Sequence, residues 1–257
     1  MLHRISQTIS DILIMTQRDI RRYFRLPQLF ITNIILNVVL LLLFNYVFGG
    51  AIQTKGIAYI QYFLPGFLVQ SVVFGSTQTS VGISEDLSRG LIDRFRSLPM
   101  ARSALLSGRV VADALRYIIL IALMIGVGYA AGFRFQAGFS SAFIGIWLIV
   151  LFGIALTWVG VFIGISVKDV ETAQVAGFVW VFPLVFASSL YVPIETMPSW
   201  LQVFAEINPV TPMVDTIRGL SWGTEITSSL WKILVWDAGI ILVTLPLALR
   251  RYRLLTH

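Results

Sequence analysis

Residues that build catalytic and metal sites are scarce in this chain. Cysteine is absent from its 257 residues, so neither a disulfide framework nor a thiolate metal site can form. The two histidines, His3 and His257, stand at the two ends, which leaves none for a metal site or a Ser–His pair inside the chain. The lysines, Lys55, Lys168 and Lys232, lack the glycine-rich context of a phosphate-binding loop. We therefore expect no catalytic residue, no metal site and no cofactor in this chain, and we do not expect an enzyme.

Charge is scarce as well, and apolar residues take its place. Charged residues make up 12% of the sequence and hydrophobic residues 57%, whereas a soluble domain carries about 25% charged residues. The mean hydropathy is +0.83. A bilayer core of about 30 Å needs roughly 20 apolar residues per helix, so a chain of this length has room for about six spans and no separate soluble domain. We predict an all-α integral membrane protein that forms one domain, 1–257, with six transmembrane helices at about 29–48, 59–84, 117–133, 139–167, 174–191 and 230–249.

The N-terminal segment, residues 1–26, has a helical pattern with two unlike sides. Apolar residues recur every three or four positions, and the arginines lie mostly on the other side. The segment is too polar for the apolar core of a cleavable signal. We predict an amphipathic helix that lies on the cytoplasmic leaflet. A partner-binding helix is the alternative.

A charged island, residues 85–102, separates the second and third predicted spans. Drawn as a helix, it has one apolar side and one ionic side, and Pro99 ends it. One interpretation is a solvated helix that joins two spans. The other is a lever that a soluble partner moves. The apolar side carries Leu87, Leu91, Phe95 and Leu98, and the ionic side carries Glu85, Arg89, Asp93 and Arg96.

Polar side chains within the first two spans are unusual because lipid cannot satisfy their hydrogen bonds. They either pack against a neighbouring helix or line a wet translocation path, and the spacing leaves both open. These residues are Asn33, Asn37, Gln70, Ser76, Thr77 and Thr79.

The third predicted helix begins with charges at contact spacing. Asp113 stands four residues from Arg109 and three from Arg116, so a local ion-paired ladder is expected, with the arginines reaching up to the interface. A proton relay is the alternative. In the fourth span, Gly160 and Gly164 have the spacing that lets helix backbones approach closely.

Residues 192–209 are half apolar, interrupted by prolines and too short to span. We predict that residues 192–228 form a re-entrant segment on the extracytoplasmic side, with two short broken helices between about residues 194 and 208 that dip into the far leaflet. Its candidate exit-side residues are Pro193, Glu195, Pro198, Trp200, Glu206, Asn208 and Pro209.

The positions of the basic residues orient the spans. Of the 19 lysines and arginines, only Lys55, Arg134, Arg218 and Lys232 fall on the far side, and the other 15 fall on the side of the N-terminus. The positive-inside rule then places both termini and the charged island in the cytoplasm. The net charge of +6 suits anionic lipid headgroups, and we expect no nucleic-acid partner.

Several motifs in order along the chain resemble the ABC-2 type permeases, especially the daunorubicin-resistance branch. No single motif is decisive, but the ordered set covers almost the whole chain. The motifs are YVFGG at 46–50, FLPG at 63–66, GLIDRFRSLPMAR at 90–102, Gly108-Arg109 with Asp113, and the segment 192–219.

The resemblance implies a permease that works as a homodimer, or with a closely related permease, together with two copies of a separate ATPase that binds ATP and Mg. It implies a multi-pass location in the plasma membrane of a bacterium or archaeon. The cargo would be a hydrophobic or amphipathic drug, lipid or glycolipid. The alternatives are a polysaccharide or lipid-linked glycan exporter, a scaffold or immunity-type protein, and an ion-coupled carrier. The resemblance assigns ATPase coupling to Ser88, Arg89, Leu91, Asp93, Arg94, Phe95 and Arg96, with a second contact at Lys168, Asp169 and Glu171.

Overall fold

Every element of the described chain is a helix. The computed structural model describes residues 2–25, 27–50, 57–91 and 104–255, and it contains no strand within them. The helices are α1 (Leu2–Arg25), α2 (Pro27–Leu43), the π-helix η1 (Phe44–Phe48), α3 (Tyr59–Ser88), α5 (Ala104–Ala130), α6 (Phe139–Ser166), α7 (Val170–Phe186), the 3₁₀ turn η2 (Ile194–Thr196), α8 (Ser199–Ile207), α9 (Val210–Trp222) and α10 (Thr227–Leu255).

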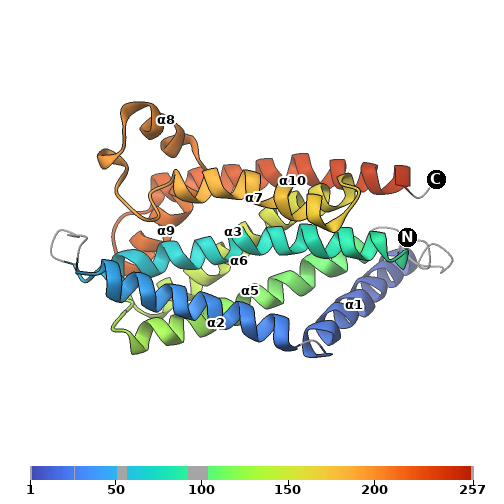
Figure 1. The fold of residues 1–257 in the computed structure, drawn as a ribbon, viewed down its shortest axis with the longest axis horizontal. Helices are drawn as coiled ribbons and strands as arrows, with labels where there is room; N and C mark the ends of the chain where they lie inside the picture. Colours follow the sequence, from blue (N-terminus) through green and yellow to red (C-terminus); the bar gives the residue numbers. More distant parts are fainter. Residues whose placement is uncertain (1, 26, 51–56, 92–103, 256–257) are drawn as a thin grey trace.

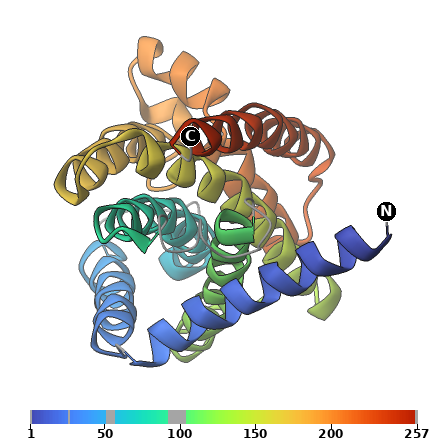
Figure 2. The ribbon, with the colours of Figure 1, turned by 90° about the vertical axis from the view of Figure 1, so that its right-hand side faces the viewer.

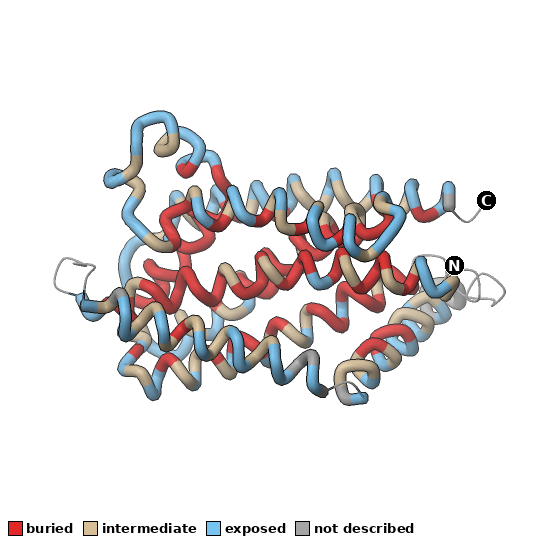
Figure 3. Tube along the Cα trace, viewed as in Figure 1, coloured by how far each residue is buried: buried red, intermediate tan, exposed pale blue. Residues whose placement is uncertain are grey.

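The long helices form a bundle around α3. In Figure 1 they run along one common direction, and α3 packs against α5, α6, α7 and α9. Figure 3 shows most of α3 buried, whereas α2 and α10 present exposed residues along their outer sides. The largest fully buried side chains include Phe63 and Phe67 of α3, Tyr117 of α5 and Phe152 of α6. α3 is therefore the central helix of the bundle, against which several other helices pack.

Small residues bring α3 and α6 into close contact. The Cα atoms of Gly160 and Gly164 face the backbone carbonyls of Ser76 and Ser80, leaving no room for a side chain on either glycine. This is the close approach that the glycine spacing predicts, and it replaces side-chain contacts with backbone packing.

The lengths and compositions of the helices suit a membrane protein. Three described helices, α5, α6 and α10, are long and apolar enough to cross a membrane. Ile31–Val47 and α7 are apolar but shorter. The 30 residues of α3 include many hydroxyl and amide side chains, which lower its hydropathy. Exposed apolar residues on α2, α7 and α10 form an outer surface that lipid can cover, among them Ile35, Val179 and Leu242.

α1 crosses one end of the bundle at a steep angle (Figure 2). It packs against α5 through Met15 and Thr16, both of which are buried, so one side of α1 is held by protein. Ile9, Leu13 and Ile14 are exposed on α1. The helix therefore has an amphipathic pattern, as predicted, and it is docked on the bundle as well as available to a membrane surface.

The charged island does not form the single helix that we predicted from residue 85. Residues 85–88 are the last turn of α3, and Gly90 has a φ of +64°, a left-handed conformation that ends the helix. The rest of the island, 92–102, lies outside the described residues, and this includes Asp93, Arg94, Phe95 and Arg96. The break arises because a glycine at the end of a helix adopts φ > 0 without steric cost.

The segment after α7 differs in detail from the predicted pair of broken helices. Residues 194–196 make only the single turn η2, and α8 projects from one end of the bundle (Figure 1), with Trp200 and Ile207 exposed. The short helix that is buried is α9, beyond Asn208 and Pro209. Apolar α9 residues such as Met213 and Ile217 contact the core, which explains why this part of the segment packs inside.

Candidate functional site

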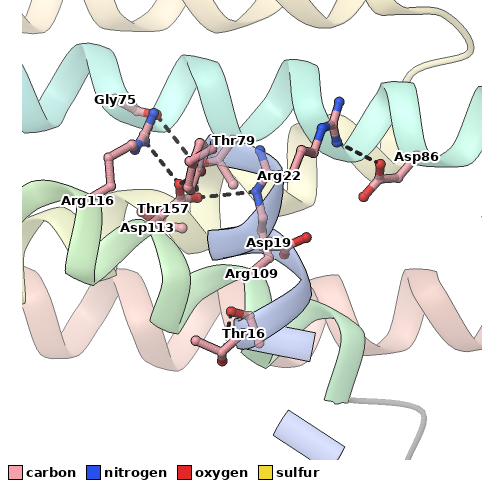
Figure 4. Close-up of polar contacts among 12 residues, drawn as sticks. Thr16, Asp19, Arg22, Gly75, Thr79, Asp86, Arg109, Asp113, Arg116 and Thr157 are labelled. Atoms are coloured by element: carbon pink, nitrogen blue, oxygen red, sulfur yellow. Dashed lines mark hydrogen bonds and ion pairs between the residues drawn. The ribbon is translucent and has the colours of Figure 1, made fainter. Parts of the chain in front are cut away.

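A buried carboxylate, Asp113, lies at the centre of a polar network where α1, α3 and α5 meet (Figure 4). Its Oδ2 accepts a hydrogen bond of 2.7 Å from Thr79, and its Oδ1 accepts one of 2.9 Å from Tyr23. Arg116 is 3.1 Å from Oδ1, and Arg109 is 3.6 Å from Oδ2. Two hydroxyls and two guanidinium groups therefore stabilise the ionised form of a carboxyl that has no exposed surface.

The two arginines are held by protein rather than by the interface. The side chain of Arg109 is 8% exposed and that of Arg116 is 14% exposed. Arg116 also donates a hydrogen bond of 3.1 Å to the backbone carbonyl of Gly75 on α3, and Gly82 leaves space for the Arg109 guanidinium. The predicted ladder is confirmed in its spacing, but the expectation that the arginines reach the interface is wrong. They are buried because α1 and α3 cover the start of α5.

α1 supplies a neutral donor to this network. Burial, followed by the negative charge of Asp113, raises the pKa of Tyr23 to about 12, so its hydroxyl keeps the proton that it donates. Next to it, burial raises the pKa of Asp19, and the nearby Arg109 and Arg18 oppose that rise. Asp19 and Tyr23 therefore lie on the side of α1 that packs against the bundle.

Ion pairs connect α1 to the last turn of α3. Arg22 is 3.1 Å from Asp86, and Arg18 is 3.2 Å from the other oxygen of the same carboxylate. Arg22 also pairs with Glu85, which in turn pairs with Arg89 one turn later. Asp86 is buried at 3% exposure, so its pairs are screened less than ordinary surface pairs. We call the following residues the ionic cluster: Arg18, Asp19, Arg22, Tyr23, Thr79, Glu85, Asp86, Arg109, Asp113 and Arg116.

The ionic cluster borders the chain on both sides of the island. It includes the last turn of α3, which leads into residues 92–103, and the first turns of α5, which follow them. A displacement of the island would reach α1, α3 and α5 together, because charge pairs and hydrogen bonds join all three. The arrangement joins the three helices mechanically on both sides of the island.

The second predicted coupling turn is a helix cap. The Asp169 carboxylate accepts a 2.7 Å hydrogen bond from the backbone N–H of Thr172 and thereby caps the N-terminus of α7. This bond, together with one from the Thr172 hydroxyl, lowers the pKa of Asp169. Lys168 and Glu171 flank the cap, and Glu171 is exposed. The conformation of this turn is therefore fixed by its hydrogen bonds to the first turn of α7.

At the opposite end of the bundle, side chains of the outer segment cap the C-terminus of α7. Arg218 donates hydrogen bonds of 2.8 Å to the carbonyls of Ser189 and Leu190, and its guanidinium lies 3.6 Å over the Tyr62 ring. Asn208 donates to the carbonyls at the end of α7, those of residues 184 and 187, at 2.6 and 2.7 Å. α9 therefore fixes the end of α7 against α3.

Four other predicted exit-side residues are exposed. Glu195 lies in η2, while Pro198 and Glu206 lie on the projecting η2–α8 segment. Pro193 precedes η2 and is also exposed.

The polar residues of the first two spans contact neighbouring helices. Asn37 donates to the Asn33 carbonyl and accepts a hydrogen bond of 3.2 Å from Ser71. Gln70 accepts a hydrogen bond of 2.7 Å from the Tyr191 hydroxyl. Thr77 contacts Gly177 of α7, and Ser76 faces Gly160 of α6. Thr79 belongs to the ionic cluster. The structure thus places these residues at helix contacts, and their role in a path stays a prediction.

Several residues of these networks were not predicted as site residues. Tyr23, Arg22 and Asp86 lack any local motif, and the contact between Arg22 and Asp86 joins positions 64 residues apart. The available signal was charge complementarity between the arginines of 18–25 and the acids at the end of the second span. Arg218 gave a further signal, as the one basic residue of the segment 192–228.

Comparison with known proteins agrees with this architecture. The model of the family described as "ABC-2 type transporter" matches residues 10–222. The chain is 31% identical over 236 residues to a daunorubicin resistance ABC transporter permease protein, DrrB1, of Streptomyces coeruleorubidus, covering 92% of this chain and 83% of that protein. It is 29% identical over 252 residues to a probable doxorubicin resistance ABC transporter permease protein, DrrC, of Mycobacterium tuberculosis, covering 97% and 91%.

Proposed function

Because the chain belongs to the ABC-2 type transporter family, we propose that it is the permease subunit of an ATP-driven exporter of hydrophobic or amphipathic molecules. A separate ATPase subunit supplies the energy. The single observation that carries the proposal is the ionic cluster, which joins α1 and α5 to the last turn of α3 beside the island. A soluble partner that pushes on the island can move the bundle only if the helices next to the island move together, and these contacts connect them.

The proposed topology has six spans and cytoplasmic termini. Its spans are α2 with η1, α3, α5, α6, α7 and α10, and α1 lies at the cytoplasmic interface. Support comes from the lengths of the apolar helices and from the excess of basic residues on one side. The membrane is the plasma membrane of a bacterium or archaeon.

The proposed coupling step begins at residues 88–98. ATP-driven closure of two ATPase subunits moves this lever, with Lys168, Asp169 and Glu171 as the second contact. The last turn of α3 moves with it, and the Arg22–Asp86 and Tyr23–Asp113 contacts carry α1 and α5 along. Close packing of α3 on α6 and α7 passes the motion to the rest of the bundle. ATP and Mg bind to the partner, and in this step the present chain transmits the motion.

The working assembly is a pair of permeases with two ATPases. The exposed apolar sides of α2 and α7 support a second permease copy beside them, since the path of a symmetric exporter runs between two copies. A row of aromatic rings follows this side of the molecule, with adjacent centroids 5.2–6.1 Å apart. The row consists of Phe74, Phe178, Phe182, Phe186 and Tyr191.

The proposed cargo is an amphipathic drug, lipid or glycolipid. The names of the two relatives, which refer to daunorubicin and doxorubicin resistance, support a planar aromatic drug. The aromatic row also favours a second candidate, a polysaccharide or lipid-linked glycan, because the apolar faces of sugar rings pack on aromatic rings as well.

Reconstitution tests the proposed function. The chain is purified alone and with the ATPase encoded beside its gene, and ATP hydrolysis and ATP-dependent uptake of daunorubicin or a labelled glycan are measured in inside-out proteoliposomes. We expect hydrolysis and uptake only from the complex, and no uptake when the ATPase carries an inactivating substitution. Hydrolysis by the chain alone, uptake without ATP, or failure to form any complex with an ATPase would contradict the proposal.

A further inference from the structure

Another buried carboxyl, Asp237 on α10, has none of the partners that surround Asp113. Asp237 is 3% exposed, and neither of its side-chain oxygens has a hydrogen-bond partner among the described residues. It stands ten residues into α10, which is one of the helices long and apolar enough to cross a membrane. At about 1.5 Å per residue, this places the carboxyl roughly 15 Å from the start of the helix.

The charged groups on the helices packed against α10 are bonded to other partners. α10 packs mainly against α6 and α9, and the sequence of α6 contains no Asp, Glu, Lys, Arg or His. α9 contributes Asp215 and Arg218. Arg218 is bonded to the carbonyls of residues 189 and 190, and Asp215 accepts a hydrogen bond from Ser189. On α10 itself, Lys232 and Arg250 are both exposed.

The apolar neighbours of Asp237 complete its isolation. Ile233 and Ile240 lie one turn before and one turn after it on the same side of α10, and both pack in the main hydrophobic core. An ionised carboxylate in such a place has the full desolvation free energy against it, because no cation or hydrogen-bond donor offsets it. A protonated carboxyl is neutral, and its cost is that of an ordinary polar group. The physical balance therefore favours the protonated form.

We infer that Asp237 is a proton-binding site inside the bundle, occupied by a proton when α10 is packed against α6 and α9. Asp113 and Asp237 are then buried carboxyls in opposite states. Asp113 is an anion between two arginines, and Asp237 is a neutral acid among aliphatic side chains. Loss of the proton from Asp237 places an unpaired charge at the packed surface of α10, so alkaline conditions loosen α10 from the bundle.

The sign of the pH effect follows from the number of bound protons. The folded state keeps a proton on Asp237 where the unfolded state, with its carboxyl in water, has released it. Stability then decreases as the pH rises, because the folded state binds more protons than the unfolded state. This property belongs to the chain alone, so its tests need no ATPase and do not depend on the proposed transport function.

Infrared spectroscopy of the purified chain in a detergent without ester groups tests the protonation state directly. The carbonyl stretch of a protonated carboxylic acid is separate from the bands of a carboxylate, and such a detergent avoids the ester carbonyls of lipids, which overlap it. We expect such a band at mildly acidic pH in the wild type, weaker in Asp237→Asn and unchanged in Asp215→Asn, the matched control whose side chain is 45% exposed. Equal band intensity in wild type and Asp237→Asn would overturn the inference.

Thermal unfolding between mildly acidic and alkaline pH gives a second readout. We expect the unfolding temperature of the wild type to fall as the pH rises above about 4, where an aspartate in water ionises, and we expect this fall to be reduced in Asp237→Asn and in Asp237→Leu. Both variants are neutral at every pH and keep the branched shape of the aspartate side chain; asparagine matches it in volume, and leucine matches its apolar surroundings. The same decrease with rising pH in the wild type and in a folded variant would overturn the inference.

Discussion

The Tyr23 hydroxyl on α1 donates a 2.9 Å hydrogen bond to Asp113 on α5, which lies 90 residues further along the chain. This bond joins α1, which crosses one end of the bundle, to a carboxylate buried where α1, α3 and α5 meet. The bond shows that α1 is part of the folded unit. Replacing Tyr23 with phenylalanine would remove only the hydroxyl that makes this contact.

Replacing Tyr23 with phenylalanine should loosen α1 from α5. Asp113 keeps Thr79 and Arg116 but loses one donor to a buried charge, a change that costs about 1.5–3 kcal/mol. Denaturant unfolding in detergent micelles measures the loss. Tyr46→Phe is the control because Tyr46 is 71% exposed. Equal stability of Tyr23→Phe and Tyr46→Phe would show that the bond contributes nothing.

Removal of the Asp113 carboxylate should be much more damaging. Asp113→Ala leaves Arg109 and Arg116 buried without a counter-charge, and breaking a buried pair in this way costs about 3–5 kcal/mol. Asp113→Asn keeps the hydrogen-bonding shape and should lose less. The yield of monodisperse protein and its unfolding midpoint are the measurements, with the exposed Glu225→Ala as control. A wild-type midpoint for Asp113→Ala would contradict the electrostatic role.

The α1–α3 ion pairs should matter for coupling more than for stability. The Arg22 side chain is 31% exposed, and Asp86 keeps its pair with Arg18 when Arg22 is replaced, so loss of the Arg22 pair should cost little free energy of folding. Asp86 itself is buried, so Asp86→Arg should cost more stability than Arg22→Asp, because it buries a cation beside Arg18. Arg22→Asp or Asp86→Arg should lower the ratio of transport to ATP hydrolysis in the reconstituted complex. The double exchange should recover part of that ratio, since the two charges face each other again. No recovery in the double variant would argue against a direct pair.

The glycine contact of α6 with α3 should be sensitive to one methyl group. Gly160→Ala places a Cβ against the backbone carbonyl of Ser76, which cannot move aside as a flexible side chain would, and the expected cost is about 1–3 kcal/mol. Gly239→Ala on α10 is the matched control, because nothing lies within 4 Å of its added Cβ. Unfolding of the two variants under the same conditions separates steric conflict from a general effect of alanine. Equal midpoints would refute the close contact.

The helices themselves were largely readable from the sequence. The apolar run predicted at 139–167 is α6 at Phe139–Ser166, and the Arg109–Asp113–Arg116 spacing predicts the ladder that the structure contains. Both are local properties, fixed by hydrophobic runs and by three- and four-residue spacing.

Long-range contacts and breaks were not readable in the same way. The expectation that Arg109 and Arg116 reach the interface was wrong because it took no account of α1, which packs over α5 through contacts about 90 residues apart in sequence. The single helix predicted across residue 90 failed because Gly90 turns the chain at the end of α3. No periodicity indicates that Arg218 bonds to the carbonyls that follow α7, since tertiary packing alone brings them together.

The most direct test of the account is the membrane sidedness of residue 89. The chain has no cysteine, so Arg89→Cys introduces a unique thiol at a side chain that is 64% exposed. Labelling with a membrane-impermeant maleimide is compared in intact cells and inside-out vesicles, with Trp200→Cys on α8 as the opposite-side control. The account predicts that Arg89→Cys is labelled only in inside-out vesicles and is protected when the ATPase is bound. Labelling of Arg89→Cys in intact cells would contradict it.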